Sequence, residues 1–114
     1  MDTWFERYLS SWETQDVDAV LAWFTDDCVM EDTTLGHGAQ GLEAMRTFVR
    51  ASFRNVPEGR FEFVRGHDDG HSFAIEWVMQ PMGVRGASVG QLRDGKIAVQ
   101  RDYWYGALYA VPNT

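Results

Sequence analysis

Two predicted strands lie in residues 60–80, which read RFEFVRGHDDGHSFAIEWVMQ. Apolar and polar side chains alternate before the turn at residues 68–70, and the alternation resumes from Phe73 to Met79. A period of two is typical of β-strands with one buried face, and a short polar break between two such runs is typical of a hairpin. The stretch therefore predicts two antiparallel strands in hairpin relation, and it determines the class of fold.

The alternation continues beyond this hairpin. Pro-Met-Gly at residues 81–83 is a second break, and residues 85–92 then predict a third strand. Asp94-Gly95 is a strong signal of a tight hairpin, and it precedes a last predicted strand over residues 97–105. The second half of the chain therefore predicts a four-strand antiparallel meander.

The first half of the chain has a helical period instead. The expected elements are an aromatic amphipathic helix over residues 3–13, a second helix capped by Asp16 that ends near residues 26–27, a short strand over residues 28–33, a loop over residues 36–41, and a third helix from Leu42 that stops before Pro57. Helices on one face of an antiparallel sheet define the α+β class. We expect a curved antiparallel sheet wrapped around the three helices, with a cavity between the layers for one small organic molecule.

Composition limits the classes of protein that fit. The 114 residues suffice for one domain, expected to span residues 1–114 with a loosely held tail at 107–114. A net charge of −7 disfavours nucleic acid and anionic membranes as partners. No apolar run is long enough to span a membrane, so we expect a cytoplasmic protein. Cys28 is the only cysteine and the three histidines lack ligand spacing, so we expect neither a metal site nor an organic cofactor.

Two segments of the chain resemble known enzymes. The first resembles the opening of ketosteroid isomerases, where R-Y, F-x-D-D-x-x-x-E-D and a later glycine have matching spacing; it comprises Arg7-Tyr8, residues 24–32 and Gly36. The second, residues 91–97 with Arg101-Asp102-Tyr103, resembles the closing hairpin of limonene epoxide hydrolase and SnoaL-like polyketide cyclases. All belong to the NTF2-like superfamily. This resemblance implies a cone-shaped, cystatin-like fold and a homodimer formed through the outer face of the sheet.

Asp32 and Tyr8 are candidate catalytic residues through the first resemblance. Asp32 falls where the isomerases keep their proton-shuttling aspartate, and Tyr8 matches the tyrosine that donates a hydrogen bond to the developing oxyanion. Met30 shares a strand face with Asp32, and Trp12 shares the aromatic stripe of Tyr8, so both are expected to contact a ligand. The alternatives are that Asp32 caps a strand end in water and that Tyr8 belongs to the core.

Asp102 falls where the epoxide hydrolase keeps the aspartate that activates water. Alternation puts Gln100, Asp102 and Trp104 on one face of the last strand, which makes all three candidates for the cavity wall. The alternative for Asp102 is an ion pair with a neighbouring arginine. Glu76 is expected either in solvent or in the cavity, where it would bind substrate, and His37 lies in a glycine-rich segment that could reach the mouth of the cavity.

Two classes of function fit these residues. The first is an enzyme of the isomerase, cyclase or epoxide hydrolase type, acting by general acid and base catalysis on a small apolar carbonyl or epoxide compound. Asp32 or Asp102 would then move the proton, and Tyr8 would hold an oxygen. The second is a non-catalytic ligand carrier or dimerising scaffold. The incomplete match to either catalytic set favours the second class, because residues 86–91 contain no acid and no Asp-Arg-Asp set is present.

Overall fold

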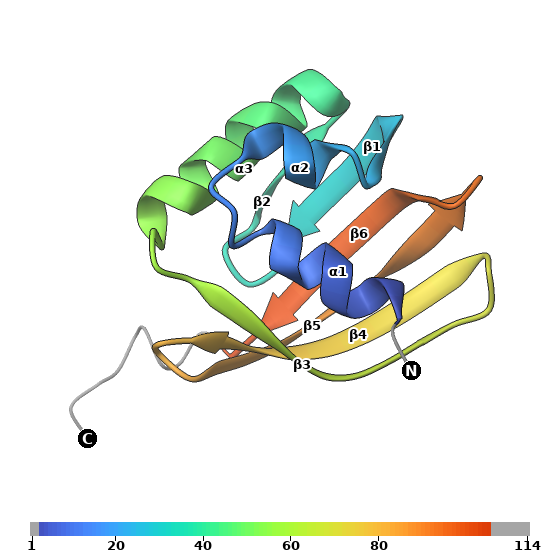
Figure 1. The fold of residues 1–114 in the computed structure, drawn as a ribbon. Coiled ribbons are helices and arrows are strands. Elements are labelled where there is room, and N and C mark those ends of the chain that lie inside the picture. The colour runs from blue at the N-terminus through green and yellow to red at the C-terminus, as the bar shows by residue number, and fades with distance from the viewer. Residues whose placement is uncertain (1–2, 106–114) are drawn as a thin grey trace.

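The fold is a curved six-stranded sheet with three helices on its concave side (Figure 1). A computed structural model describes residues 3–105. The elements in chain order are α1 (Trp4–Ser11), α2 (Val17–Leu21), β1 (Phe24–Asp32), β2 (His37–Gln40), α3 (Leu42–Asn55), β3 (Arg60–Asp68), β4 (Ser72–Gln80), β5 (Val84–Arg93) and β6 (Lys96–Trp104). The predicted α+β class is confirmed. The tail predicted at residues 107–114 lies outside the described residues.

The strands follow the order β2-β1-β6-β5-β4-β3 across the sheet. Strands β3 to β6 form the predicted antiparallel meander. Strand β1, however, pairs parallel with β6, so the sheet is mixed where a wholly antiparallel sheet was expected. This pairing joins the two halves of the chain and brings Asp32 opposite Asp102.

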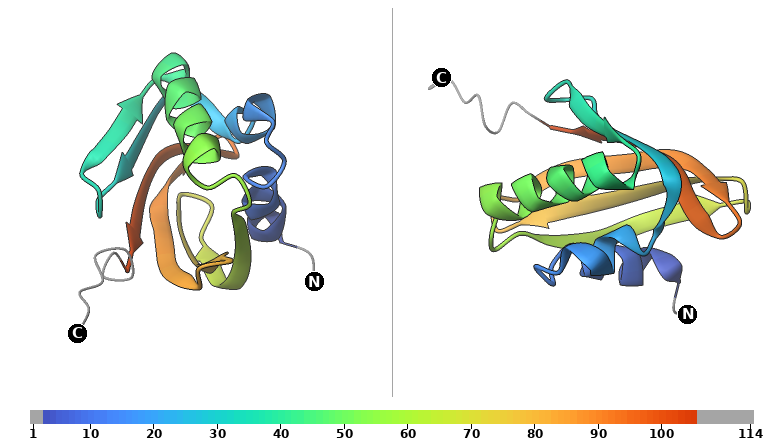
Figure 2. Two further views of the ribbon diagram at one scale, coloured as in Figure 1. Left: turned by 90° about the vertical axis from the view of Figure 1, so that its left-hand side faces the viewer. Right: turned by 90° about the horizontal axis from the view of Figure 1, so that it is seen from above.

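Three register shifts bend the sheet. They lie between Phe24 and Val29 on β1, between Phe63 and Arg65 on β3, and between Gln91 and Leu92 on β5. Shifts of this kind increase the local twist and bend of a strand. The strands therefore wrap around the interior, and the helices cover the open side (Figure 2).

The aromatic stripe of α1 is buried, as predicted, and it connects the helices to the sheet. The Phe5 ring stacks on Phe63 of β3 with the ring centroids 5.8 Å apart. Trp12, just beyond α1, contacts Phe53 of α3 and Phe61 of β3 edge-on, at centroid distances of 6.3 and 6.4 Å. Edge-on and offset contacts between large rings stabilise packing beyond their buried area. Contacts with β3 and with α3 therefore together fix the position of α1.

Two boundaries differ from the prediction. Helix α2 ends at Leu21, because Phe24 already pairs with Ile97 and the Ile97 amide donates to the Trp23 carbonyl at 2.8 Å. Residues 37–40, expected in a loop, form β2 against the end of β1. Gly38 lies so close to the Met30 carbonyl that no Cβ would fit there. Gly38 made the segment look like a loop in the sequence, but the close pairing of β1 and β2 requires a glycine at this position.

Two local signals are confirmed. The Asp16 carboxylate caps α2 by accepting from the backbone amides of Asp18 and Ala19 at 3.0 and 3.4 Å. Asp94 and Gly95 both have positive φ, 52° and 77°, as the tight hairpin between β5 and β6 requires.

No helix within residues 3–105 is long and apolar enough to cross a membrane. The homodimer through the outer sheet face stays a prediction.

Gly86 on β5 makes room for a tryptophan of the neighbouring strand. It pairs with Trp77 in the register of β4 and β5, and a Cβ at this position would overlap the six-membered ring of the indole. Trp77 is buried, and its ring contacts Phe61 edge-on with the centroids 5.1 Å apart. The absent side chain at residue 86 therefore determines where the Trp77 ring lies.

We expect Gly86→Ala to lower the free energy of unfolding by about 1–3 kcal/mol, because the buried indole has to move. Trp77→Phe removes the ring atoms that a Cβ would meet, so the double variant should lose less than the sum of the two single losses. Denaturant unfolding of the four proteins measures this coupling. Strictly additive losses would contradict the contact.

Candidate functional site

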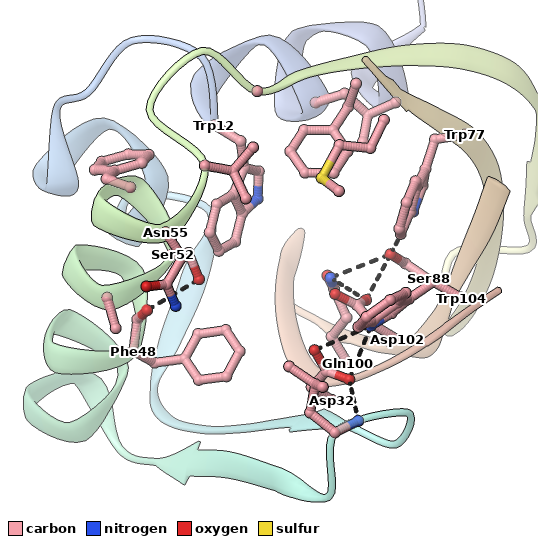
Figure 3. A pocket seen from close by; sticks show the side chains of 18 of the residues that line it. Trp12, Asp32, Phe48, Ser52, Asn55, Trp77, Ser88, Gln100, Asp102 and Trp104 are labelled. Carbon is pink, nitrogen blue, oxygen red and sulfur yellow. Dashed lines mark hydrogen bonds between the residues drawn. The ribbon is translucent and has the colours of Figure 1, made fainter. Parts of the chain in front are cut away.

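A cavity of about 1040 Å³ lies between the helices and the concave face of the sheet. This volume is at the upper end of the range for small-molecule sites. One side, here called the carboxyl wall, consists of Asp32 of β1, Ser88 of β5, and Gln100, Asp102 and Trp104 of β6. The facing side, here called the helical wall, consists of α3 residues Ala44, Thr47, Phe48, Ala51, Ser52 and Asn55 (Figure 3).

Asp102 is the centre of the carboxyl wall. Its Oδ1 atom accepts a hydrogen bond from the Ser88 hydroxyl at 2.6 Å and another from the Gln100 amide at 2.9 Å. Ser88 in turn accepts from the Trp77 indole at 2.9 Å. No hydrogen bond from residues 3–105 reaches the other carboxyl oxygen, Oδ2. The two oxygens are therefore different, and Oδ2 is available to a ligand in the cavity.

Tyr8 determines the orientation of the Gln100 amide. Its hydroxyl donates to Oε1 of Gln100 at 2.7 Å, and both side chains are only 1% exposed. With Oε1 occupied by Tyr8, the amide nitrogen turns toward Asp102. Burial, followed by the negative charge of Asp102, raises the pKa of Tyr8 above its ordinary value. The phenol therefore keeps its proton and acts as a hydrogen-bond donor.

Asp32 lies beside Asp102 on the neighbouring strand. The two residues are register partners on strands whose backbones are about 4.8 Å apart, and both line the cavity. The indole of Trp104 donates to both carboxyl oxygens of Asp32, at 3.0 and 3.1 Å, and the Leu35 amide donates at 3.0 Å. The donors to this carboxylate from residues 3–105 are therefore uncharged groups.

The pKa of Asp102 is raised from 3.8 to about 6. Burial is the largest cause and the negative charge of Asp32 also raises the pKa, whereas the hydrogen bonds from Ser88 and Gln100 lower it. The shift in the pKa of Asp102 is thus caused by its burial and by three neighbouring residues of the carboxyl wall. A carboxyl group with a pKa near 6 can both take up and release a proton close to neutral pH, as a general acid or base must.

The helical wall follows the period of α3. Residues 44, 47, 48, 51, 52 and 55 recur at intervals of three and four, so they lie on one face of the helix. The Ser52 hydroxyl donates to the Phe48 carbonyl at 3.0 Å, and the His37 ring of β2 lies 5.9 Å from the Phe48 ring. His37 is exposed and lines the cavity, together with the exposed Leu35. These residues mark the side on which the cavity opens.

Six of the eight predicted site residues line this one cavity: Tyr8, Trp12, Asp32, Gln100, Asp102 and Trp104. Met30 does not, because it is 2% exposed and packs in the core farther along β1. Glu76 does not either, and the expectation that it binds substrate is corrected by its position. It lies on the outer face of β4 and pairs with Arg65 at 3.0 Å, since the cavity face of that strand carries Trp77.

Sequence reasoning missed other residues of the cavity, among them Ser88, Trp77, Phe48 and Asn55. The strand period of Trp77 and the helix period of Phe48 were visible, but both patterns indicate burial without distinguishing core from cavity. Ser88 had no signal of its own. Its role comes from the register of β5 and β6, which pairs it with Asp102.

Metal-ligating side chains do not gather at this site. Within residues 3–105, no group of three or more His, Cys, Asp or Glu side chains is arranged to hold a metal ion. Asp32 and Asp102 form a pair only, and their remaining neighbours on the wall are amide, hydroxyl and indole groups. The arrangement has the features of a proton-transfer or ligand-binding site.

Comparison with protein families identifies the fold family. A sequence profile of the SnoaL-like domain matches residues 5–100. The chain belongs to the SnoaL-like family. The predicted superfamily is thereby confirmed, and the SnoaL-like profile extends from Phe5 of α1 to Gln100 of β6. The comparison with curated proteins found no match.

Solved structures with a similar fold agree with the SnoaL-like assignment. A SnoaL-like protein of unknown function from Burkholderia thailandensis has a TM-score of 0.78 at 19% identity, over 93% of this chain and 99% of that one. A protein with a ketosteroid isomerase-like fold from Catenulispora acidiphila, in complex with trimethylamine, has a TM-score of 0.74 at 19% identity, over 84% of this chain and 80% of that one. A suggested polyketide cyclase from Sinorhizobium meliloti has a TM-score of 0.73 at 22% identity, over 84% of this chain and 89% of that one. At these identities the likeness concerns the fold.

The pKa of Asp102 should respond to its neighbours in opposite directions. Ser88→Ala removes a hydrogen bond to the charged form, so the pKa should rise above about 6. Asp32→Asn removes a negative charge beside it, so the pKa should fall. Carboxyl carbon NMR of the two variants measures both shifts. Movement of both values in one direction would contradict the assigned causes.

Asp102→Asn should stabilise this SnoaL-like protein above pH 6. Because the folded protein holds the Asp102 proton more tightly than the unfolded chain, ionisation of Asp102 destabilises the fold above its folded pKa. The gain in unfolding free energy at pH 8 should be about 1–3 kcal/mol. It should shrink as the pH falls from 6 to 4. Denaturant unfolding of both proteins across this range measures the difference, and a gain independent of pH would be inconsistent with this linkage.

Proposed function

We propose that the cavity is the active site of an enzyme that transfers a proton on a small, largely apolar carbonyl compound, with Asp102 as the general base. One observation carries this proposal: a carboxyl group with a pKa of about 6 faces a cavity large enough for an organic molecule, with one oxygen free of hydrogen bonds from residues 3–105. A base with this pKa is ionised at neutral pH and still strong enough to take a proton.

The proposed step uses only groups of this chain. In a β,γ-unsaturated carbonyl compound, Oδ2 of Asp102 takes a proton from the carbon between the carbonyl group and the C=C bond. The electron pair of the broken C–H bond forms a new C=C bond to the carbonyl carbon, and the π pair of the carbonyl group moves to its oxygen. The same carboxyl group then returns the proton to the far carbon of the original C=C bond as the carbonyl group re-forms, which completes an isomerisation. The amide of Asn55 on the helical wall is available across the cavity to donate to the developing oxyanion.

The other predicted catalytic residues support Asp102 in this proposal. Asp32 raises the pKa of Asp102 by its charge and holds the Trp104 indole against the cavity. Tyr8 orients Gln100, which keeps Oδ1 of Asp102 occupied and leaves Oδ2 for the substrate. Tyr8 thus acts as a positioning residue, since its hydroxyl already donates to Gln100.

The likeness to other SnoaL-like structures supports a small ligand. One structure with this fold was solved with trimethylamine, and another comes from a suggested polyketide cyclase. The cavity in this chain is lined by the rings of Trp12, Phe48 and Trp104 as well as by its two aspartates. Rings and aliphatic side chains favour an apolar body, and the carboxyl wall favours a polar group at one end.

A non-catalytic ligand carrier is the second candidate. The observation that favours it is the commitment of the Tyr8 hydroxyl to Gln100, because a buried donor aimed at a substrate oxygen is then missing from the carboxyl wall. A carrier binds its ligand without exchanging protons with it. The assay below distinguishes the two candidates.

Proton transfer can be followed as deuterium uptake beside the carbonyl group in a panel of cyclic ketones, measured by NMR in heavy water. Exchange should rise with pH through a midpoint near 6, because the base form of Asp102 is required. Asp102→Asn should lower kcat/KM by about 10²- to 10⁴-fold. Glu76→Gln is the matched control, since it removes a carboxylate on the outer face and should leave the rate unchanged.

The carrier hypothesis predicts a different result. Ketones would then bind to the wild type and to Asp102→Asn alike, with no deuterium uptake above the rate in buffer for any ketone of the panel. That outcome would rule out the proton-transfer proposal and leave ligand binding as the function of the cavity.

A further inference from the structure

The charged side chains that line the cavity are mainly acidic. Asp32, Glu58 and Asp102 line it, and the lining includes no lysine or arginine from residues 3–105. His37 is the one lining side chain of the described chain that can carry a positive charge, and it lies at the exposed side. An anionic ligand would therefore enter a negative field, and a cationic ligand an attractive one.

Neither aspartate of the carboxyl wall has a cationic partner in the described protein. Asp32 accepts from the Trp104 indole and the Leu35 amide, and Asp102 accepts from Ser88 and Gln100. The ion pairs of residues 3–105 lie elsewhere: Arg46 with Asp18, Arg65 with Glu76, Arg93 with Asp27, and Arg101 with Glu31. Two carboxylates thus share one cavity without a counter-charge from the part of the chain that the structure describes.

This arrangement is costly in the free protein. Carboxylates in a partly desolvated site favour the neutral form, and a second negative charge adds to the cost. The raised pKa of Asp102 reflects that cost. Burial is its largest cause, and the charge of Asp32 also contributes. A positive charge from outside the chain would relieve both contributions at once, because it would lie beside both carboxylates.

The aromatic residues provide the rest of a cation site. Trp12 and Phe48 lie across the cavity from Trp104 and the two aspartates (Figure 3). The face of an aromatic ring attracts an organic cation, by about 0.5–2 kcal/mol depending on how far the site is desolvated. Ring faces on one side and carboxylates on the other suit an ammonium group attached to an apolar body.

We propose that the natural ligand of the cavity is a carbonyl compound that also carries an amine, held as an ammonium ion between the aromatic rings and the Asp32 and Asp102 carboxylates. This inference rests on the proton-transfer function proposed above and names the class of molecule on which that function acts. Asp32 binds the charge, while Oδ2 of Asp102 stays directed at the carbon that loses its proton.

Three adamantane derivatives of equal shape test the inference: 1-adamantylamine, 1-adamantanol and adamantane-1-carboxylate. At pH 8 the amine is a cation and Asp102, with its pKa of about 6, is ionised. Titration calorimetry of the full chain should give an affinity for the amine at least about tenfold above that for the alcohol. The carboxylate should bind most weakly.

Single variants assign the effect to the carboxyl wall. Asp32→Asn should lower the affinity for the amine by about fivefold or more and leave the affinity for the alcohol unchanged. Asp102→Asn should act in the same direction. Glu76→Gln removes an equal charge from the outer face and should change neither affinity. Binding of the alcohol also reports whether the cavity stays formed in each variant.

Several outcomes would overturn the inference. An alcohol that binds as tightly as the amine shows that the cavity does not select charge, and so does an amine preference that survives Asp32→Asn and Asp102→Asn. Failure of all three probes to bind shows that the cavity does not accept an apolar body of this size. The proton-transfer function is decided separately by deuterium exchange in neutral ketones, so the two proposals can fail independently.

Discussion

The register of β6 between β1 and β5 is the constraint on which the site depends. It puts Asp32, Asp102 and Ser88 in one row across three adjacent strands, with Asp102 in the middle. Backbone hydrogen bonds determine this row, so the distance between the two carboxylates does not depend on loop conformation. The side chains around the row then decide which oxygen of Asp102 is held and which is left for a ligand.

A second layer of contacts, from α1 and from β4, keeps this row in place. Tyr8 of α1 reaches across the interior to Gln100, and the indole of Trp77 reaches Ser88 from β4. Each of these donors is buried, and each ends on a residue that contacts Asp102. The aromatic core therefore also supports the polar wall, and a change in core packing reaches the Asp102 carboxyl group through two successive hydrogen bonds.

The sequence predicts those features that depend on local periodicity. Alternation along the last strand put Gln100, Asp102 and Trp104 on one face, and the Asp-Gly pair located the final hairpin; both are confirmed. Features that depend on contacts between distant segments were not visible. Examples are the parallel pairing of β1 with β6, the strand at residues 37–40, and the role of Ser88, which follows only from its register partner.

Glu76 and Met30 show where periodicity stops being informative. Alternation separates the two faces of a strand but does not say which face is concave, and for β4 the apolar residues take the inner side and leave Glu76 outside. Met30 shares the inner face with Asp32, yet it lies deeper along the strand, where the interior is filled. Face and depth are both needed to assign a residue to a cavity, and depth is a property of the whole fold. The same limit applies to fold similarity, which assigns the family without assigning the chemistry.

The two walls of the cavity come from separate parts of the chain, and this separation has an evolutionary consequence. Ala44, Thr47 and Ala51 project from α3, far in sequence from the strands that carry the aspartates. Larger or smaller side chains at these three positions would reshape the space for the ligand while the carboxyl row kept its geometry. A lineage could in this way acquire new ligands by drift on one helix and keep the carboxyl row unchanged.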